Sequence, residues 1–157
     1  MLDHPRAIAL TEAARAEIDR LENIFSLYRA GSEISVLNAK GRLQAPSFEL
    51  LECLGLARRV HAVTEGRFDP TVQPLWRALA EAHVSGTAPR PEALAQARAS
   101  IGFHRVRFDA TRVVLAPDQQ LTLNGIAQGF IADRVARLMQ AVKSWPGGTR
   151  RISGGGR

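Results

Sequence analysis

The hydrophobic pattern changes its period along the chain, and this change restricts the fold more than any other feature. Residues 11–28 carry an apolar stripe at helical spacing, formed by Ile18, Leu21, Phe25 and Tyr28. Thr11 is placed to cap the start of this helix. Residues 104–116 alternate instead, around a turn at 110–112, which predicts a β-hairpin. Helices in one part of the chain and a hairpin in another predict an α+β fold.

Capping and turn residues predict the remaining elements. Ser47 is expected to begin a helix that ends near Gly66, and Pro91 to begin one that ends at Ser100. Glycine and serine punctuation predicts a loop after residue 28. Three further elements are expected, namely a helix over 75–83, a short strand over 121–124 and a long helix over 127–142.

Composition bounds the chain to one soluble domain followed by a different tail. The 157 residues suit a single core, and the one cysteine, Cys53, lies in an apolar helical run. The net charge is +6, but residues 143–157 contribute four cations and no acid. No basic face with a nucleic-acid motif is visible, so nucleic-acid binding is disfavoured. The Gly/Arg-rich, aperiodic tail over 143–157 is expected to be disordered.

The sequence also indicates where the chain resides. It has no run of about 18 apolar residues that would span a membrane. The first ten residues contain an early acid and no long apolar core, unlike a signal peptide. The chain as written is therefore expected to be cytoplasmic.

Three polar segments are candidates for a binding site, and each has a purely structural alternative. Residues 29–38 offer hydroxyls and a carboxylate, or form a connection in which Ser32 caps an element. Residues 68–74 place an aromatic beside an Asp-Pro pair, or begin a helix with Asp69 as N-cap. Residues 124–129 join a strand to a helix, where glycines admit a ligand's phosphate or serve helix–sheet packing.

Taken together, these segments resemble the ApbE family. The matching segments are LENIFSLYRAGSEISVLN at 21–38, TEGRFDPTVQPLW at 64–76, IGFHRVRFD at 101–109 and LTLNGIAQGFIADRVARLM at 121–139. The resemblance covers most of positions 8–142. It implies an FAD:protein FMN transferase, which uses magnesium to cleave FAD, transfers FMN to a threonine of a target protein and releases AMP. Targets in the family include flavoprotein subunits of membrane redox complexes, and many members are periplasmic lipoproteins.

The resemblance also assigns roles residue by residue. Ala127 matches a position that gives its backbone carbonyl to the Mg²⁺ ion, and Gln128 replaces a frequent lysine. No catalytic residue is assigned. The positions that match FAD contacts, Gln128 included, are Tyr28, Ser32, Glu33, Arg67, Phe68, Asp69, Asn124, Gln128 and Phe130.

The sequence departs from the family after residue 142. Family members continue further, and their later segments supply an Asp and a Thr for the metal, which have no match here. Residues 1–142 are therefore expected to be a partial ApbE-like FAD-binding domain, followed by an aberrant tail such as a frameshift gives. The chain is expected to be an inactive fragment of the transferase. The alternative is a non-catalytic flavin-binding or interaction module.

Overall fold

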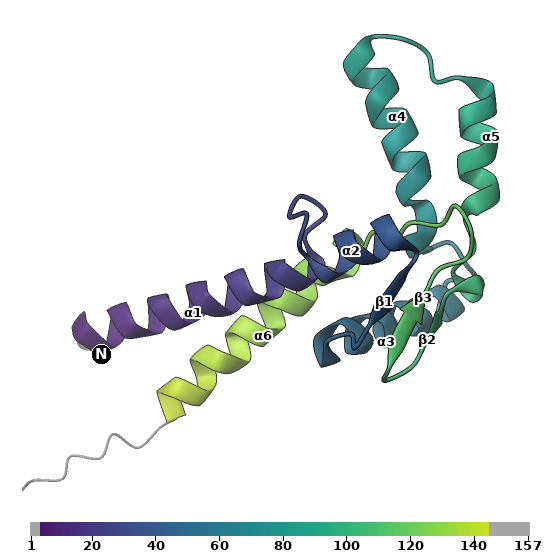
Figure 1. Ribbon diagram of the computed structural model, residues 1–157. Coiled ribbons are helices and arrows are strands. Elements are labelled where there is room, and N and C mark those ends of the chain that lie inside the picture. Colours follow the sequence, from purple (N-terminus) through teal and green to yellow (C-terminus); the bar gives the residue numbers. More distant parts are fainter. Residues whose placement is uncertain (1–3, 145–157) are drawn as a thin grey trace, which may run out of the picture.

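The computed structural model describes residues 4–144 (Figure 1). The tail expected over 143–157 lies outside the described residues, except for the two positions that end the last helix. In chain order the elements are α1 (His4–Phe25), α2 (Glu33–Lys40), β1 (Arg42–Gln44), α3 (Phe48–Val63), η1 (Pro70–Val72), α4 (Gln73–Ser85), α5 (Pro91–Ser100), η2 (Phe103–Arg105), β2 (Arg107–Phe108), β3 (Arg112–Val114) and α6 (Asn124–Ser144).

The sheet has three short antiparallel strands in the order β1-β3-β2. Strands β2 and β3 form the expected hairpin, in which Phe108 pairs with Val113. The predicted strand over 121–124 is wrong, because β1 is the third strand and pairs Leu43 with Val113. The backbone near residue 121 is bonded elsewhere, since the Leu121 N–H donates to the Asn38 side chain at 2.7 Å.

The loop expected after residue 28 is only partly correct, because it contains both α2 and β1. Ser32 is the N-cap of α2, and its Oγ accepts the Ser35 N–H at 3.2 Å. Gly41 ends the helix in the left-handed conformation (φ 68°), which turns the chain directly into β1. A two-turn helix is too short to produce a clear periodic signal, whereas its caps are recognisable.

Helix α1 also differs from its prediction. It begins at His4 and ends at Phe25, so Tyr28 lies beyond it. Thr11 does not cap the helix, because its Oγ1 donates back to the Ala7 carbonyl at 2.9 Å. The other helix starts agree more closely: Ser47 caps α3 and Pro91 is the first residue of α5.

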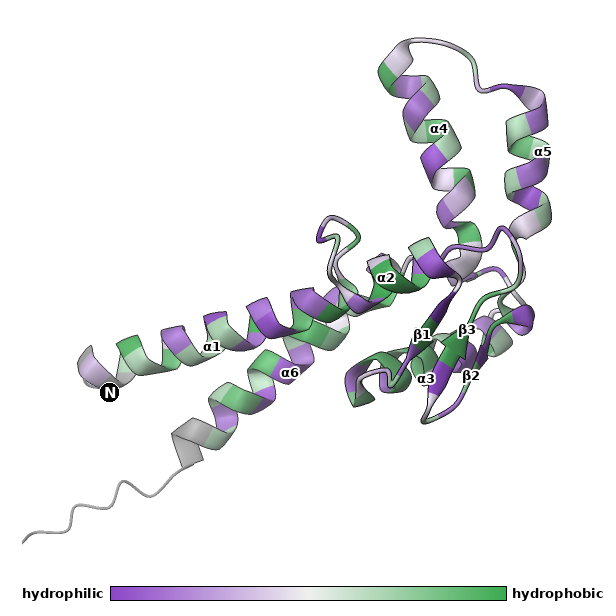
Figure 2. Ribbon diagram, viewed as in Figure 1, coloured by the Kyte–Doolittle hydropathy of each residue, from purple (hydrophilic) through white to green (hydrophobic). Residues whose placement is uncertain are grey.

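The core lies where α1, α2, α3, the sheet and the start of α6 meet. Figure 2 shows apolar residues gathered on α2, α3 and β3 in this region. Helices α1 and α6 continue side by side away from it, and the α4–α5 hairpin projects in another direction (Figure 1). Fully buried core side chains include Leu21, Ile34, Leu37, Leu50, Cys53, Leu54, Val113, Leu121 and Leu123. Within residues 4–144, no helix is long and apolar enough to cross a membrane.

Candidate functional site

The segment between α3 and η1 is a tightly bonded turn that presents Phe68. The Gly66 N–H donates to the His61 carbonyl at 2.9 Å, with Gly66 at φ 79°, a conformation that favours glycine. The Phe68 N–H donates to Thr64 Oγ1 at 3.1 Å. The Phe68 carbonyl lies 2.8 Å from His61 Nδ1. The backbone on both sides of the Phe68 ring is therefore fixed to the end of α3.

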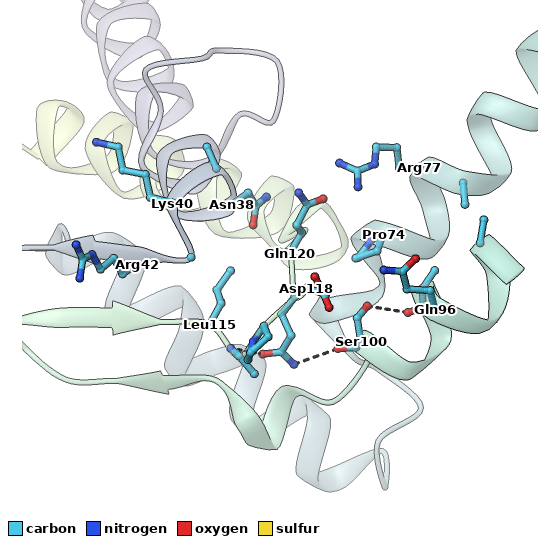
Figure 3. A pocket seen from close by; sticks show the side chains of 18 of the residues that line it. Asn38, Lys40, Arg42, Pro74, Arg77, Gln96, Ser100, Leu115, Asp118 and Gln120 are labelled. Atoms are coloured by element: carbon cyan, nitrogen blue, oxygen red, sulfur yellow. Dashed lines mark hydrogen bonds between the residues drawn. The ribbon is translucent and has the colours of Figure 1, made fainter.

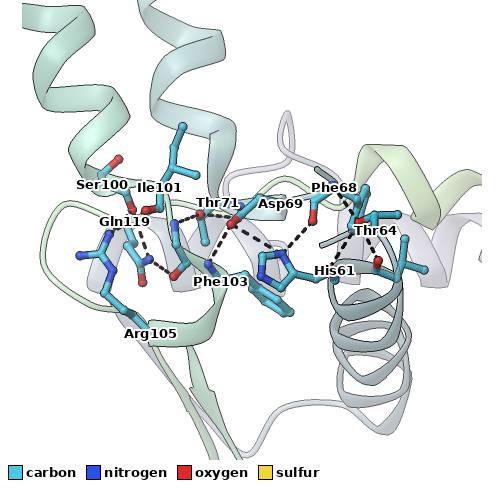
Figure 4. A network of polar contacts seen from close by, with 12 residues as sticks. His61, Thr64, Phe68, Asp69, Thr71, Ser100, Ile101, Phe103, Arg105 and Gln119 are labelled. Atoms are coloured by element: carbon cyan, nitrogen blue, oxygen red, sulfur yellow. Dashed lines mark hydrogen bonds and ion pairs between the residues drawn. The ribbon is translucent and has the colours of Figure 1, made fainter. Parts of the chain in front are cut away.

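Asp69 is the centre of a polar network that Figure 4 shows. Its Oδ1 accepts the Thr71 N–H at 2.8 Å and the Thr71 hydroxyl at 2.5 Å. Its Oδ2 accepts the Phe103 N–H at 3.0 Å. The expected N-cap role of Asp69, with Pro70 at the first position, is confirmed for the 3₁₀ helix η1. The carboxylate thus holds residues from two distant parts of the chain.

The start of α6 lies directly against this turn. The Thr122 N–H donates to the Pro70 carbonyl at 2.8 Å, and the Leu123 carbonyl accepts the Ala127 N–H at 2.7 Å. A side chain on Gly125 would begin only 3.2 Å from Phe68 Cε2. The segments 68–74 and 124–129, far apart in sequence, therefore form one surface. Asn124 and Gln128 are exposed on it.

Phe130 faces a different side of α6. An α-helix turns by roughly 100° per residue, so the Phe130 side chain, six residues after Asn124, points about 240° around the helix axis from the Asn124 side chain. Its ring packs edge-on to Phe25, with centroids 5.6 Å apart, and the Arg134 guanidinium lies over it at 5.2 Å. Phe130 also lines a small cavity of about 140 Å³ with Glu52 and other charged residues. The structure thus separates Phe130 from the surface that holds Asn124 and Gln128.

The residues predicted in the first segment differ sharply in exposure. Tyr28 is 94% exposed. Ser32 is completely buried, and its hydroxyl donates to the Ser26 carbonyl at 2.6 Å. Glu33 Oε2 accepts both the backbone N–H and the hydroxyl of Ser47, each at 3.0 Å. The side chains of Ser32 and Glu33 are therefore committed to joining α1, α2 and α3.

Arg29 holds the loop that carries Tyr28. Its guanidinium pairs with Asp19 at 2.9 Å and with Glu22, both on α1. The Arg29 guanidinium donates to the Asp19 carboxylate, and this hydrogen bond raises the pKa of Arg29 further above the physiological range, where arginine is always charged. Arg67, by contrast, is exposed, and its guanidinium contacts only its own turn, namely Glu65 Oε2 at 3.3 Å and the Thr64 carbonyl at 3.5 Å. Tyr28 and Arg67 are exposed, and no hydrogen bond or ion pair within the described residues joins either side chain to Phe68.

The side chains around Ala127 do not supply the oxygen ligands that would complete a magnesium site. Ala127 is buried in α6, and residues 4–144 contain no group of three His, Cys, Asp or Glu side chains that could hold a metal. Magnesium prefers near-octahedral oxygen ligands that usually include one or two carboxylates. The Ala127 carbonyl has a second lone pair to offer, but the described residues surround it with no such set.

Sequence reasoning missed several residues that shape this surface. Asn38 forms a two-way amide pair with the Leu121 backbone, donating to its carbonyl at 2.8 Å and accepting its N–H at 2.7 Å. Gln119 donates to the Gly102 carbonyl at 2.8 Å. His61 Nδ1 contacts the Phe68 carbonyl, and the Thr71 hydroxyl donates to Asp69 Oδ1. The positions of Asn38 and Thr71 inside matching segments could have signalled their roles, whereas His61 and Gln119 lie outside those segments.

A larger cavity of about 940 Å³ lies elsewhere, between the α4–α5 hairpin and the ends of α2 and β3 (Figure 3). The predicted site residues are all described, and none of them lines it. Lys40, Arg42 and Arg77 line it together with Glu81 and Asp118, and Arg77 already faces Glu81 at 3.9 Å. Charge therefore selects no particular ligand there.

Comparison with known proteins identifies relatives of this fold. The chain is 30% identical to an FAD:protein FMN transferase of Haemophilus influenzae over 91% of this chain and 45% of that protein. It is 33% identical to one of Chlamydia muridarum over 73% of this chain and 38% of that protein. The chain thus spans less than half the length of these relatives.

Solved structures agree with the sequence comparison. The flavin transferase of Vibrio cholerae superposes with a TM-score of 0.77 at 26% identity, covering 91% of this chain and 47% of that one. The apo flavinyl transferase of Pseudomonas stutzeri gives a TM-score of 0.78 at 25% identity, covering 87% and 44%. The α+β fold is therefore the one found in flavin transferases. The model of the ApbE family matches residues 2–146 of this chain. The chain therefore belongs to the ApbE family.

Proposed function

We propose that this chain binds FAD on the surface formed by Phe68 and the start of α6. The observation that carries the proposal is the approach of Phe68 to Gly125, 3.2 Å from the position of a Cβ. It joins two segments that the family resemblance assigns to FAD. The relatives' names, FAD:protein FMN transferase, support the same ligand.

The chemistry of this surface suits a flavin nucleotide. The start of a helix carries a partial positive charge that attracts phosphate, and α6 has no acidic residue in its first turn to oppose an anion. Because the N–H groups of Ile126 and Ala127 already donate to the Leu123 carbonyl, the Gly125 N–H is the one placed to bind a phosphate oxygen. The exposed Asn124 amide both donates and accepts hydrogen bonds. Phe68 and the exposed Tyr28 offer aromatic faces for a planar ring. Phosphate recognition by the start of α6 and ring recognition by Phe68 would therefore come from adjoining segments.

The proposed reaction in which this portion takes part is FMN transfer. The threonine oxygen of an acceptor flavoprotein, a subunit of a membrane redox complex, bonds to the FMN phosphorus. The pyrophosphate bond of FAD breaks and AMP leaves. Magnesium would stabilise the charge on the phosphates. Because the described residues do not complete a magnesium site, we propose that the chain alone binds FAD and does not transfer FMN.

Titration of the purified chain with FAD, followed by flavin fluorescence, tests the binding proposal. We expect saturable binding that Asn124→Leu and Phe68→Leu both weaken, because each removes a contact and keeps the bulk. Phe48→Ala is the matched control, since Phe48 is an exposed aromatic at the start of α3, at the opposite end of that helix from the turn that carries Phe68. Absence of binding, or equal weakening by all three variants, would refute the proposal.

A transfer assay separates binding from catalysis. The chain is incubated with FAD, magnesium and a family acceptor domain, and the denatured acceptor is examined for covalent flavin fluorescence. We expect FAD binding and no labelled acceptor. Clear magnesium-dependent labelling would mean that this chain holds a complete transfer site. FAD binding without transfer would also fit a non-catalytic flavin-binding module. Identification of the natural acceptor or partner would distinguish such a module from the FAD-binding portion of a transferase.

A further inference from the structure

The carboxylate of Asp69 is already occupied by the protein itself. The Asp69 side chain is 8% exposed. Oδ1 accepts two hydrogen bonds from Thr71, and Oδ2 accepts one from the Phe103 N–H. The His61 ring lies beside the same oxygen, with Nδ1 3.7 Å from Oδ2, beyond hydrogen-bond distance. A carboxylate has about four acceptor positions, so little of Asp69 remains for a ligand.

Thr71 extends these bonds across the fold. It is completely buried, and its Oγ1 accepts the Gly102 N–H at 2.8 Å while donating to Asp69. Gly102 has φ 153°, in the range that glycine adopts most easily. Gln119 donates to the Gly102 carbonyl from the other side at 2.8 Å. The segment after α5 is thereby bonded to the segment that carries Phe68.

His61 holds the same segment from α3. A carbonyl oxygen only accepts, so the short contact with the Phe68 carbonyl, at 2.8 Å, requires the proton on His61 Nδ1. The His61 ring also packs edge-on to Phe103, with centroids 5.8 Å apart. The backbone of Phe68 is therefore set from two directions, by His61 directly and by Asp69 through its neighbour in sequence.

We propose that Asp69 and Thr71 are positioning residues that hold Phe68 against Gly125, and that the Asp69 carboxylate makes no contact with FAD. This inference rests on the proposed FAD site. It departs from the family resemblance, which counts Asp69 among the positions that match FAD contacts. In this chain Phe68 and the backbone meet the ligand, and the buried carboxylate fixes their placement.

Thr71→Val tests the inference, because the buried hydroxyl cannot touch FAD and valine keeps the shape. We expect the affinity for FAD to fall about tenfold, as for loss of a hydrogen bond to a charged group. Amide hydrogen exchange without FAD should rise in residues 66–72 and 101–105. In the double variant Thr71→Val/Asp69→Asn, the loss of FAD affinity should be no greater than in the weaker-binding single variant, because both residues act through one network.

The chain provides a matched control in the β2–β3 turn. Asp109 Oδ1 accepts the Thr111 N–H at 2.7 Å and the Thr111 hydroxyl at 2.5 Å, the same local arrangement in an exposed position. Thr111→Val should leave FAD affinity unchanged. If Thr71→Val also leaves it unchanged while Asp69→Asn weakens it, Asp69 contacts FAD directly and the inference is overturned.

His61 variants keep the test decisive if Thr71→Val does not fold. His61→Leu removes the donor to the Phe68 carbonyl, and His61→Asn restores a donor near the position of Nδ1. We expect His61→Leu to lose affinity and His61→Asn to recover part of it; equal losses would contradict the inference. If the unaltered chain binds no FAD, the proposed function fails. The positioning role is tested separately by amide hydrogen exchange without FAD, and unchanged exchange of residues 66–72 in the His61→Leu variant would overturn it.

Discussion

Gly125 and Gly129 in α6 have different surroundings, although the sequence presents them as one GxxxG pair. A Cβ on Gly125 would meet the Phe68 ring at 3.2 Å, whereas nothing lies within 4 Å of the same position on Gly129. The first glycine is therefore required by a close approach. The second is an exposed helical glycine, which costs backbone entropy without a packing reason.

Substitution of these two glycines should have opposite effects. Gly125→Val should displace Phe68 and weaken FAD binding severalfold, because the added atoms occupy the space of the ring. Gly129→Ala should raise the free energy of unfolding by about 1 kcal/mol, since alanine is the better helix former, and should weaken FAD binding less than Gly125→Val, since its methyl group meets no protein atom within 4 Å. Thermal unfolding and FAD titration of both variants measure this. Similar affinities for the two variants would argue against a site at Phe68.

The individual roles of the site residues show where sequence reasoning ends. The cap roles of Ser32, Ser47 and Asp69 could be predicted, because a cap bonds to residues two or three positions away. The bonds from Asp69 to Phe103 and from Asn38 to Leu121 could not. They join residues 34 and 83 positions apart, and no local pattern encodes such a pair.

At the scale of elements, length decided which predictions were correct. The long helices α3 and α6 carry a periodic signal over several turns, and the hairpin alternates around a recognisable turn. Helix α2 has eight residues and β1 has three, too few for either period to emerge. The predicted strand over 121–124 is apolar because Leu121 and Leu123 are core residues, although their backbone pairs with no strand.

The α4–α5 hairpin is expected to be the least stable part of the described fold. It buries only small or short side chains, namely Pro74 and Ala82 from α4 and Ala97 and Ser100 from α5. Its amides should exchange with solvent through local opening at a lower free energy than those of α3. Native-state hydrogen exchange in low urea measures the difference. Equal protection of α3 and the hairpin would show that the whole fold opens as one unit.

At the scale of the molecule, one core joins segments from most of the described chain. Leu21 of α1, Leu54 of α3, Val113 of β3 and Leu123 before α6 all have no exposed surface. Cys53 is buried among them. Burial raises the pKa of its thiol to about 12, with a smaller contribution from the neighbouring Glu52. The thiol therefore reports on the integrity of the core.

Cys53 should be unreactive in the folded protein at pH 8. The thiolate is the reactive form, and burial both excludes the reagent and keeps the thiol protonated. In denaturing urea the thiol regains an ordinary pKa and should react at once. A thiol-specific chromogenic reagent, added across a urea series, should give a labelling rate that follows unfolding of the core. Rapid labelling without urea would contradict the packing around α3.

The α4–α5 hairpin also provides a position at which extra residues can be inserted into the chain. Its connection, residues 86–90, lies at the end of the projection farthest from the sheet, and Gly86 closes α4 there in the left-handed conformation. Residues inserted at this tip would extend into solvent and move no group near Phe68 or Asn124. A peptide tag or a small fluorescent domain placed between Thr87 and Ala88 would therefore leave the flavin surface intact, whereas one added residue between His61 and Asp69 would destroy it.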